Sequence, residues 1–286
     1  MALSKVSSLN SLFNTIFEDA IFVAREQNLM AALVTPFSDN TFADRQMGIY
    51  PQLTAQVVTE GVDYANPIEW TKTSTMTISP KRIQVQVTLT DERIMTDPDD
   101  ARRDAAREMG GAIASKIDTD LVAEFVNFTA VKGAAGSALS IEVVAAGMSV
   151  LRAAFAPNPL WVVVHPNQWF DVWAELGAPA LTASFLGDVA NEALRNYFVG
   201  DWIGATWFTS GNIAVNATTD DASGGVFHRE ALALDTRTPL TMEVERDASL
   251  QGFEINAVAR YGTSVRRNTF GVEILSDATA PDGFGA

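Results

Sequence analysis

The sequence predicts an α+β fold in which an N-terminal arm and a long β-hairpin precede a very long helix and an α/β region. Three observations support this prediction. Apolar and polar residues alternate strictly over 71–78 and 83–90, as in strands with one buried face. Apolar residues then recur at helical spacing, without an interrupting proline, from Asp97 to about Phe128. Short helical and strand patterns follow the flexible break at 132–137.

The first 31 residues predict an amphipathic helix, because their apolar residues recur at helical spacing: Leu9, Leu12, Phe13, Ile16, Phe17 and Ala20. Such a helix docks either on its own domain or on a neighbouring subunit, and the sequence leaves both open. The stretch from Thr35 to Tyr50 is polar and irregular, which indicates an extended connector.

Residues 52–95 predict a threonine-rich antiparallel hairpin with turns at 61–67 and 79–82. Its strands carry little apolar surface for a core of their own. Since an isolated two-stranded ribbon is only marginally stable in water, this hairpin needs another surface to lie against.

The dipeptide Asp97-Pro98 is a strong helix start. About 30 residues then form one helix, roughly 45 Å long, which Gly110-Gly111 is expected to bend. After it we expect further helices at 141–155, 167–175 and 189–197, and strands at 160–164, 202–209, 212–215, 225–234, 242–246, 253–261 and 271–275. The tail from Ser276 is expected to be loose.

Composition excludes several classes of protein. The 286 residues include 35 acidic and 20 basic ones, for a net charge of −15, and no cysteine. Disulfides and thiolate sites are therefore excluded, and tight binding of nucleic acid is disfavoured because phosphate neutralisation needs cations. The sequence contains neither a secretory signal nor an apolar run of the roughly 20 residues that span a bilayer. We expect a soluble chain without a membrane partner.

The motif search identifies no catalytic or cofactor site. The two histidines, His165 and His228, stand alone at the ends of apolar strands, so no metal site is predicted. Phosphate-binding and dinucleotide-binding glycine patterns are missing. The acidic pairs fall in turns or at a helix start, where they act as caps. We therefore expect no cofactor and no enzymatic activity.

The order of the parts, together with three segments, resembles the major capsid protein of tailed bacteriophages, the Hong Kong ninety-seven type fold that encapsulin shells share. The segments are Trp161–Trp169, a strand followed by His-Pro, then Gly225–Leu234, and then Phe253–Gly262 with Val265–Leu275. The resemblance implies an N-terminal arm (1–50), an extended β-hairpin loop (51–95), a peripheral domain with the spine helix (96–132 and 243–276), an α/β axial domain (133–242) and a loose tail (277–286).

The resemblance also implies a function. Copies of the chain would assemble through pentamers and hexamers into an icosahedral virion shell around double-stranded DNA, in the cytoplasm of a host bacterium. Portal, scaffolding and decoration proteins would be partners, with scaffolding either a separate protein or already cleaved from this chain. A lysine–asparagine crosslink, as in some relatives, would use Lys72 or Lys81. Position in the hairpin suggests these inter-subunit contact residues: Val57, Val58, Trp70, Met76, Ile78, Ile83 and Val85.

Two alternatives remain open from sequence. The first is an encapsulin-type compartment, in which the same fold encloses cargo protein instead of a genome. The second is a soluble α/β enzyme or binding protein with a β-appendage, which would require a pocket with convergent polar groups.

Overall fold

The computed structural model describes residues 29–39, 41–50, 53–55, 57–61, 70–72, 74–96, 100–177 and 200–281. Its helices are α2 (Met30–Leu33), α3 (Asp91–Thr96), α4 (Asp100–Ala123), α5 (Ile141–Ala153) and α6 (Pro166–Gly177), with 3-10 turns η1 (Glu124–Asn127) and η2 (Asn268–Phe270). Its strands are β1 (Thr35–Ser38), β2 (Arg45–Ile49), β3 (Ser74–Ile78), β4 (Lys81–Thr90), β5 (Val131–Gly133), β6 (Leu160–Val164), β7 (Asp201–Trp202), β8 (Ala205–Thr209), β9 (Asp221–His228), β10 (Leu232–Asp247), β11 (Gly252–Val265) and β12 (Gly271–Asp277).

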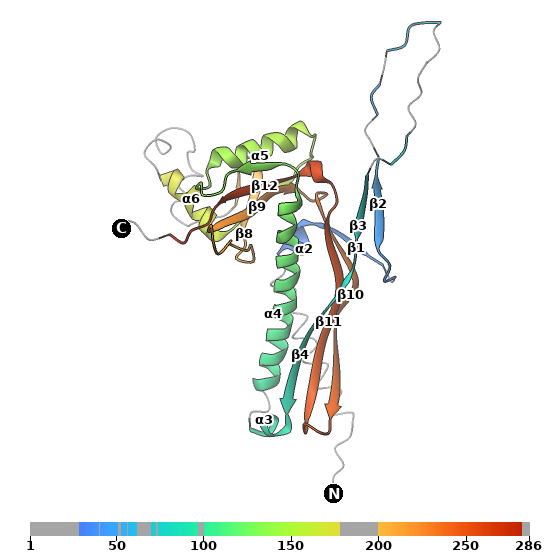
Figure 1. Cartoon of the computed structure of the whole chain (residues 1–286), viewed down its shortest axis with the longest axis vertical. Helices are drawn as coiled ribbons and strands as arrows, with labels where there is room; N and C mark the ends of the chain where they lie inside the picture. Colours follow the sequence, from blue (N-terminus) through green and yellow to red (C-terminus); the bar gives the residue numbers. More distant parts are fainter. Residues whose placement is uncertain are drawn as a thin grey trace.

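A long four-stranded sheet, in the order β1-β10-β11-β4, runs beside α4 (Figure 1). Strands β10 and β11 form an antiparallel pair, and β4 runs antiparallel to β11. The alternation of β4 turns one set of side chains, including Ile83, Val85 and Val87, toward the core under α4. The opposite set, which includes Gln84 and Gln86, is exposed.

The α/β region contains a six-stranded mixed sheet in the order β5-β12-β9-β6-β8-β7. Helix α5 packs on β12, β9 and β5. Ser140 begins α5 by accepting the backbone N–H of Val143 with its hydroxyl, at 3.4 Å. Gln168, in the first turn of α6, is fully buried and links this helix to the sheet.

One hydrophobic core joins the two sheets. It contains Leu89 and Ile255 from the long sheet, Val163 and Phe227 from the six-stranded sheet, and Phe125 between them. The rings of Phe125 and Phe227 lie 5.4 Å apart. A Cβ on Gly225 would come within 2.8 Å of the Phe125 ring, so glycine at that position lets the end of the long helix approach β9 closely.

Several predicted helices and strands agree with the observed residue ranges. Strand β6 spans the predicted residues, and α5 and α6 differ from the predicted helices by two residues or fewer at each end. The long helix runs through Gly110 and Gly111 as one element, α4, and ends in η1. The segment 225–234, expected to be one strand, is two strands with a turn between them, and 212–215 contributes only a single bridge at Val215.

The predicted hairpin over 52–95 was wrong in its pairing. Strand β3 pairs with β2, and β4 pairs with β11. The described residues between 53 and 61 form no strand. Alternation fixes which side chains share a face of a strand, but it does not identify the neighbouring strand, and here both partners are distant in sequence.

Two strands do not follow the predicted domain boundaries, which stay a prediction. Strand β10 continues across the boundary at residue 242, and β12 belongs to the six-stranded sheet although 243–276 was assigned to the peripheral domain. The tail begins later than expected, because Ser276 and Ala278 are buried. The arm up to residue 28 and the predicted helix at 189–197 lie outside the described residues.

Candidate inter-subunit surfaces

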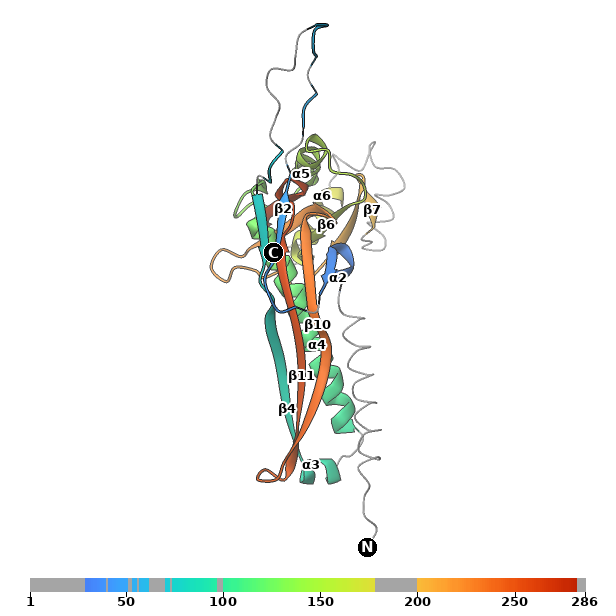
Figure 2. The ribbon, with the colours of Figure 1, turned by 90° about the vertical axis from the view of Figure 1, so that its right-hand side faces the viewer.

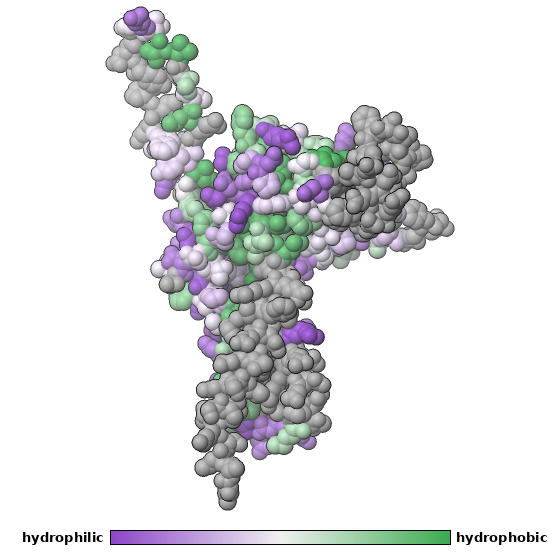
Figure 3. Space-filling model, turned by 180° about the vertical axis from the view of Figure 1, so that it is seen from behind, coloured by the Kyte–Doolittle hydropathy of each residue, from purple (hydrophilic) through white to green (hydrophobic). Residues whose placement is uncertain are grey.

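The described residues between β2 and β3 (53–55, 57–61 and 70–72), called the projecting segment, extend beyond the body of the molecule (Figures 1 and 3). Hydrophobic residues, green in Figure 3, are visible on it. Three predicted contact residues lie here: Val57 is 102% exposed, Val58 49% and Trp70 57%. Leu53 is also exposed. Scattered apolar residues are normal on a surface, but several on one projecting segment indicate a surface that another molecule covers.

Two aromatic residues lie at the base of the projecting segment. Tyr50 leaves β2 and Trp70 returns toward β3, and their rings stack with centroids 4.4 Å apart. The ammonium of Lys72 lies 5.8 Å from the Tyr50 ring, and the stem of Lys72 packs against Gly48, where a Cβ would overlap it. Trp70 is among the predicted contact residues and Tyr50 is not, because no local pattern in the sequence shows that the two rings face each other.

The other four predicted contact residues are covered by their own chain. Met76 and Ile78 are buried against Ala233, Phe37 and Met47. Ile83 and Val85 are half-buried under α4. Since these side chains are wholly or partly covered within one chain, they offer a neighbour less surface than Val57, Val58 and Trp70.

A buried ion cluster holds β2, the strand from which the projecting segment leaves, on the long sheet. Asp235 of β10 is fully buried, and its Oδ2 lies 2.8 Å from both Arg45 Nε and Arg237 Nη2. The hydrogen bond to Asp235 raises the pKa of Arg45 above its usual value. Arg237 also donates to the carbonyl oxygens of Thr41 (2.8 Å) and Ala43 (3.2 Å). The cluster thereby fixes β2 and the segment before it on β10.

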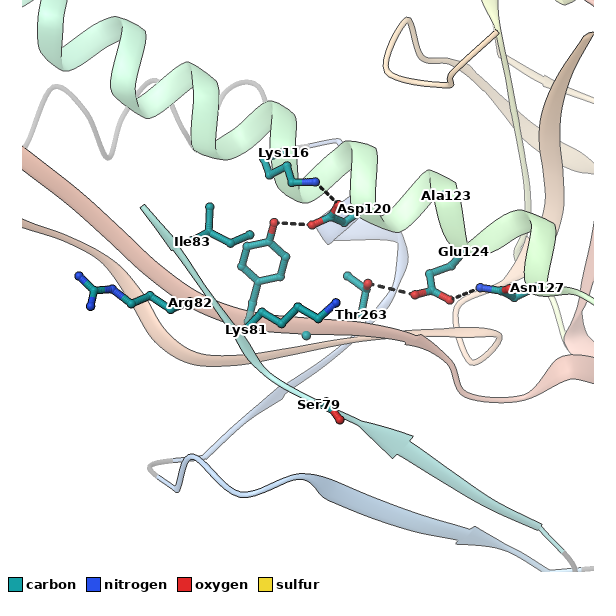
Figure 4. A pocket seen from close by; sticks show the side chains of 12 residues that line it. Ser79, Lys81, Arg82, Ile83, Lys116, Asp120, Ala123, Glu124, Asn127 and Thr263 are labelled. Carbon is teal, nitrogen blue, oxygen red and sulfur yellow. Dashed lines mark hydrogen bonds and ion pairs between the residues drawn. The ribbon is translucent and has the colours of Figure 1, made fainter. Parts of the chain in front are cut away.

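A polar hollow of about 420 Å³ lies between α4, β4 and β11 (Figure 4). The Tyr261 hydroxyl donates to Asp120 at 2.9 Å, and Lys116 pairs with the same carboxylate at 2.6 Å. Glu124 accepts from Thr263 at 3.1 Å and from Asn127 at 2.9 Å. Burial, together with Asp120, raises the pKa of the Tyr261 phenol far above its usual value. These groups satisfy one another and join the helix to the sheet.

A second, more apolar hollow has a volume of about 610 Å³. Ala123 lines both hollows, and Val122, Val126 and Ile213 are among the other residues that line the second. No group of three or more His, Asp or Glu suited to a metal ion occurs among the described residues. In the same part of the chain, no helix is long and apolar enough to cross a membrane.

The two histidines predict how stability changes with pH. His228 is 8% exposed and stacks on Trp161, and its Nδ1 accepts the Glu230 N–H at 3.3 Å. His165 Nδ1 accepts the Asn167 N–H at 3.2 Å. Burial lowers the pKa of both rings below the ordinary 6.5. Because the folded state favours the neutral rings, their stabilisation is present above pH 6.5 and is lost as pH falls below it.

We therefore expect the free energy of unfolding to fall as pH is lowered from 7 to 5, measured by urea titration. A His165→Asn/His228→Asn variant should show a clearly shallower fall, since asparagine keeps an acceptor but does not titrate. An equal fall in both proteins would show that other groups cause the pH dependence.

A family model described as "Phage capsid protein" matches residues 73–274. The chain belongs to this family. None of the curated proteins matches the sequence.

Solved structures of shell proteins share the fold. A chain of Mycobacterium phage Che8 superposes with a TM-score of 0.65 at 19% identity, covering 81% of this chain and 84% of that one. The capsid of an empty GTA particle gives 0.67 at 12% identity, covering 88% and 90%. The virus-like particle from Pyrococcus furiosus gives 0.61 at 10% identity, covering 91% and 98%.

Membership of the phage capsid family makes this chain a structural subunit of a virion shell and not an enzyme. The expected capsid fold is confirmed by the superpositions. The alternative of a soluble enzyme with a β-appendage is therefore wrong. Since capsids are assemblies of repeated subunits, the functional surfaces of this phage capsid protein are those that contact other copies.

Proposed function

We propose that this phage capsid protein assembles into pentamers and hexamers that close an icosahedral shell around double-stranded DNA, with the projecting segment seated on a neighbouring copy. The observation that carries the proposal is the exposure of Val57, Val58 and Trp70 on a segment outside the body of the subunit. Assembly in a bacterial cytoplasm, with portal, scaffolding and decoration proteins as partners, belongs to the same proposal.

The physical argument rests on apolar area. A fully exposed valine gains about 1.5–3 kcal/mol when it is buried, and a shell repeats that gain at every quasi-equivalent contact. The Tyr50–Trp70 stack at the base limits the orientations of the segment before a neighbour arrives. Such preorganisation lowers the entropic cost of docking.

A Val57→Asp/Val58→Asp variant is expected to remain a folded subunit that does not form shells. Two carboxylates placed in an apolar contact would be desolvated without a partner, at a cost that weak quasi-equivalent contacts cannot offset. Sedimentation velocity and negative-stain microscopy of the purified protein measure the loss, which should be at least tenfold in assembled mass.

The matched control is Thr54→Asp/Thr59→Asp, which adds the same charge at exposed positions next to the valines. It should assemble like the unaltered chain. Normal shells from the valine variant would contradict the proposed contact, and equal failure of both variants would mean that charge alone blocks assembly.

The alternative that the sequence leaves open, an encapsulin-type shell, would enclose cargo protein instead of a genome. The two candidates differ in content. Shells purified from their natural source and treated with nuclease should release protected double-stranded DNA in the first case, and a single abundant foreign protein in the second.

A further inference from the structure

The face of the long sheet that points away from α4 is mostly polar, and its residues are exposed or half-buried except for Val258, which is buried. Figure 2 looks onto this side, with β4, β11 and β10 in front of the helix. The strand register places these residues on it: Arg82, Gln84, Gln86 and Thr88 of β4, Glu254, Asn256, Val258 and Arg260 of β11, and Thr238, Thr241, Glu243 and Glu245 of β10. We call this set the outer face.

Positive charge gathers at the end of the outer face nearest the projecting segment. Arg82 and Arg260 are direct partners in the register of β4 and β11. The Arg260 guanidinium lies 4.4 Å from the ring of Phe42, which is 63% exposed. Arg82 donates to Gln84 at 2.6 Å. Arginine is one of the residue types enriched among those that contribute most to binding energy at protein interfaces.

Negative charge gathers at the other end of the outer face. Glu245 and Glu254 are direct partners in the register of β10 and β11, and Glu243 is exposed beside them. Glu254 accepts one hydrogen bond, from Gln86 at 2.9 Å. No ion pair within the described residues involves these three glutamates or the two arginines.

Like charges directly opposite each other on a sheet destabilise it. The free chain is therefore destabilised at both ends of the outer face.

Arg260 and Glu254 lie six residues apart on β11, or about 20 Å along the strand. We propose that the outer face is an interface with a second copy of this chain, packed face to face with its strands reversed, so that the arginine end of each copy meets the glutamate end of the other.

Charge complementarity selects the second copy as the occupant. A nucleic acid would suit the arginine end only, and a basic protein would suit the glutamate end only. A reversed copy offers both opposite charges at the required spacing, and one rotation satisfies both contacts at once. This interface deepens the proposed shell function and uses a surface distinct from the projecting segment.

Charge reversal tests the pairing. Arg82→Glu/Arg260→Glu makes the whole outer face acidic, and Glu245→Arg/Glu254→Arg makes it basic. Each variant alone should lose at least tenfold in associated mass by sedimentation velocity at low salt. Mixed in equal amounts, the two should associate again, because an acidic face then meets a basic one. The quadruple variant, with both ends exchanged, should associate alone.

The matched control for the basic variant is Glu142→Arg/Asp201→Arg, which changes net charge equally at two exposed positions far from the outer face. It should associate normally. Unchanged association of either reversed variant would overturn the interface. So would failure of the mixture when both proteins keep the circular dichroism of the unaltered chain. If a double variant does not fold, the single changes Arg82→Glu and Glu245→Arg are mixed in the same way.

Crosslinking separates this interface from the shell proposal. The chain has no cysteine, so a Gln86→Cys variant carries one thiol, near the centre of the proposed two-fold contact. With sheets about 10 Å apart, a bismaleimide about 12 Å long should join two copies. Glu245→Cys should not react in this way, because its two-fold mate lies about 20 Å away along the strands.

The crosslinking is done on the Val57→Asp/Val58→Asp background, in which no shell is expected. Crosslinked dimer there supports the outer-face contact whether or not the projecting segment works as proposed. Dimer from Glu245→Cys but not from Gln86→Cys, or from neither, would overturn the reversed pairing.

Discussion

Replacing Asp235 by alanine is expected to lower the free energy of unfolding by about 3–5 kcal/mol, the usual cost of removing one partner from a buried ion pair. Asp235 is fully buried and is the shared anion of Arg45 and Arg237. The Arg237 side chain is 1% exposed, so without Asp235 its charge would remain in the core with Asp39, at 3.3 Å, as its remaining ion-pair partner among the described residues. Urea unfolding of the assembly-deficient valine variant measures the loss without a contribution from the shell.

Asp39→Ala is the matched control. Asp39 contacts the same two guanidinium groups, at 3.3 and 3.6 Å, but its side chain is 46% exposed. Water can replace an exposed carboxylate, so this loss should stay below about 1 kcal/mol. An equal loss in the free energy of unfolding for Asp235→Ala and Asp39→Ala would mean that burial does not determine how much each carboxylate contributes to stability.

Replacing Gln168 by leucine is expected to cost about 2–4 kcal/mol, because several buried polar groups would lose a partner. The Gln168 Nε2 donates to the Ala222 carbonyl oxygen and to Ser276 Oγ, both at 2.8 Å. Its Oε1 accepts the His165 N–H at 2.9 Å. One amide therefore joins the first turn of α6 to β9 and β12, and leucine keeps its bulk but none of these bonds. The same urea titration gives the difference.

Gln86→Leu serves as the comparison in the unassembled subunit. Gln86 is exposed and makes one side-chain hydrogen bond, to Glu254. We expect a change within about 0.5 kcal/mol, as for most surface substitutions. If Gln168→Leu were equally mild, the buried amide would contribute packing alone.

Local patterns predicted many of the elements of this fold but not the strands that pair with one another. Leu160–Val164 is apolar throughout, as a strand covered on both faces must be, and it was found without error. The pairing of β4 with β11 was missed because their residues are about 170 positions apart and the alternation of β4 would suit any neighbour. The predicted strands at 225–234 and 242–246 leave a gap that contains Pro239, whereas β10 continues through it with register shifts between Thr236 and Thr238 and between Thr238 and Thr241.

The same limit applies to the contact residues. Alternation identified Met76 and Ile78 as apolar positions on one strand face, and it could not reveal that Ala233, Phe37 and Met47 cover that face. Val57 and Val58 were named from their position in the predicted hairpin, and both are exposed although the described residues around them form no strand. The ion cluster gave no local signal, since Arg45 and Asp235 are joined only by the folded chain.

The core shared by the two sheets has a mechanical consequence. Phe125 and Phe128, at the end of the long helix, pack in a single cluster with residues of β4, β9 and β11. Rotating one sheet against the other would open that close-packed cluster, so we expect each subunit to behave as one stiff lever. A change in the curvature or diameter of the shell would then arise at the contacts between subunits, while each subunit keeps its shape. The long sheet would convert a small tilt near Phe125 into a large displacement at its far end.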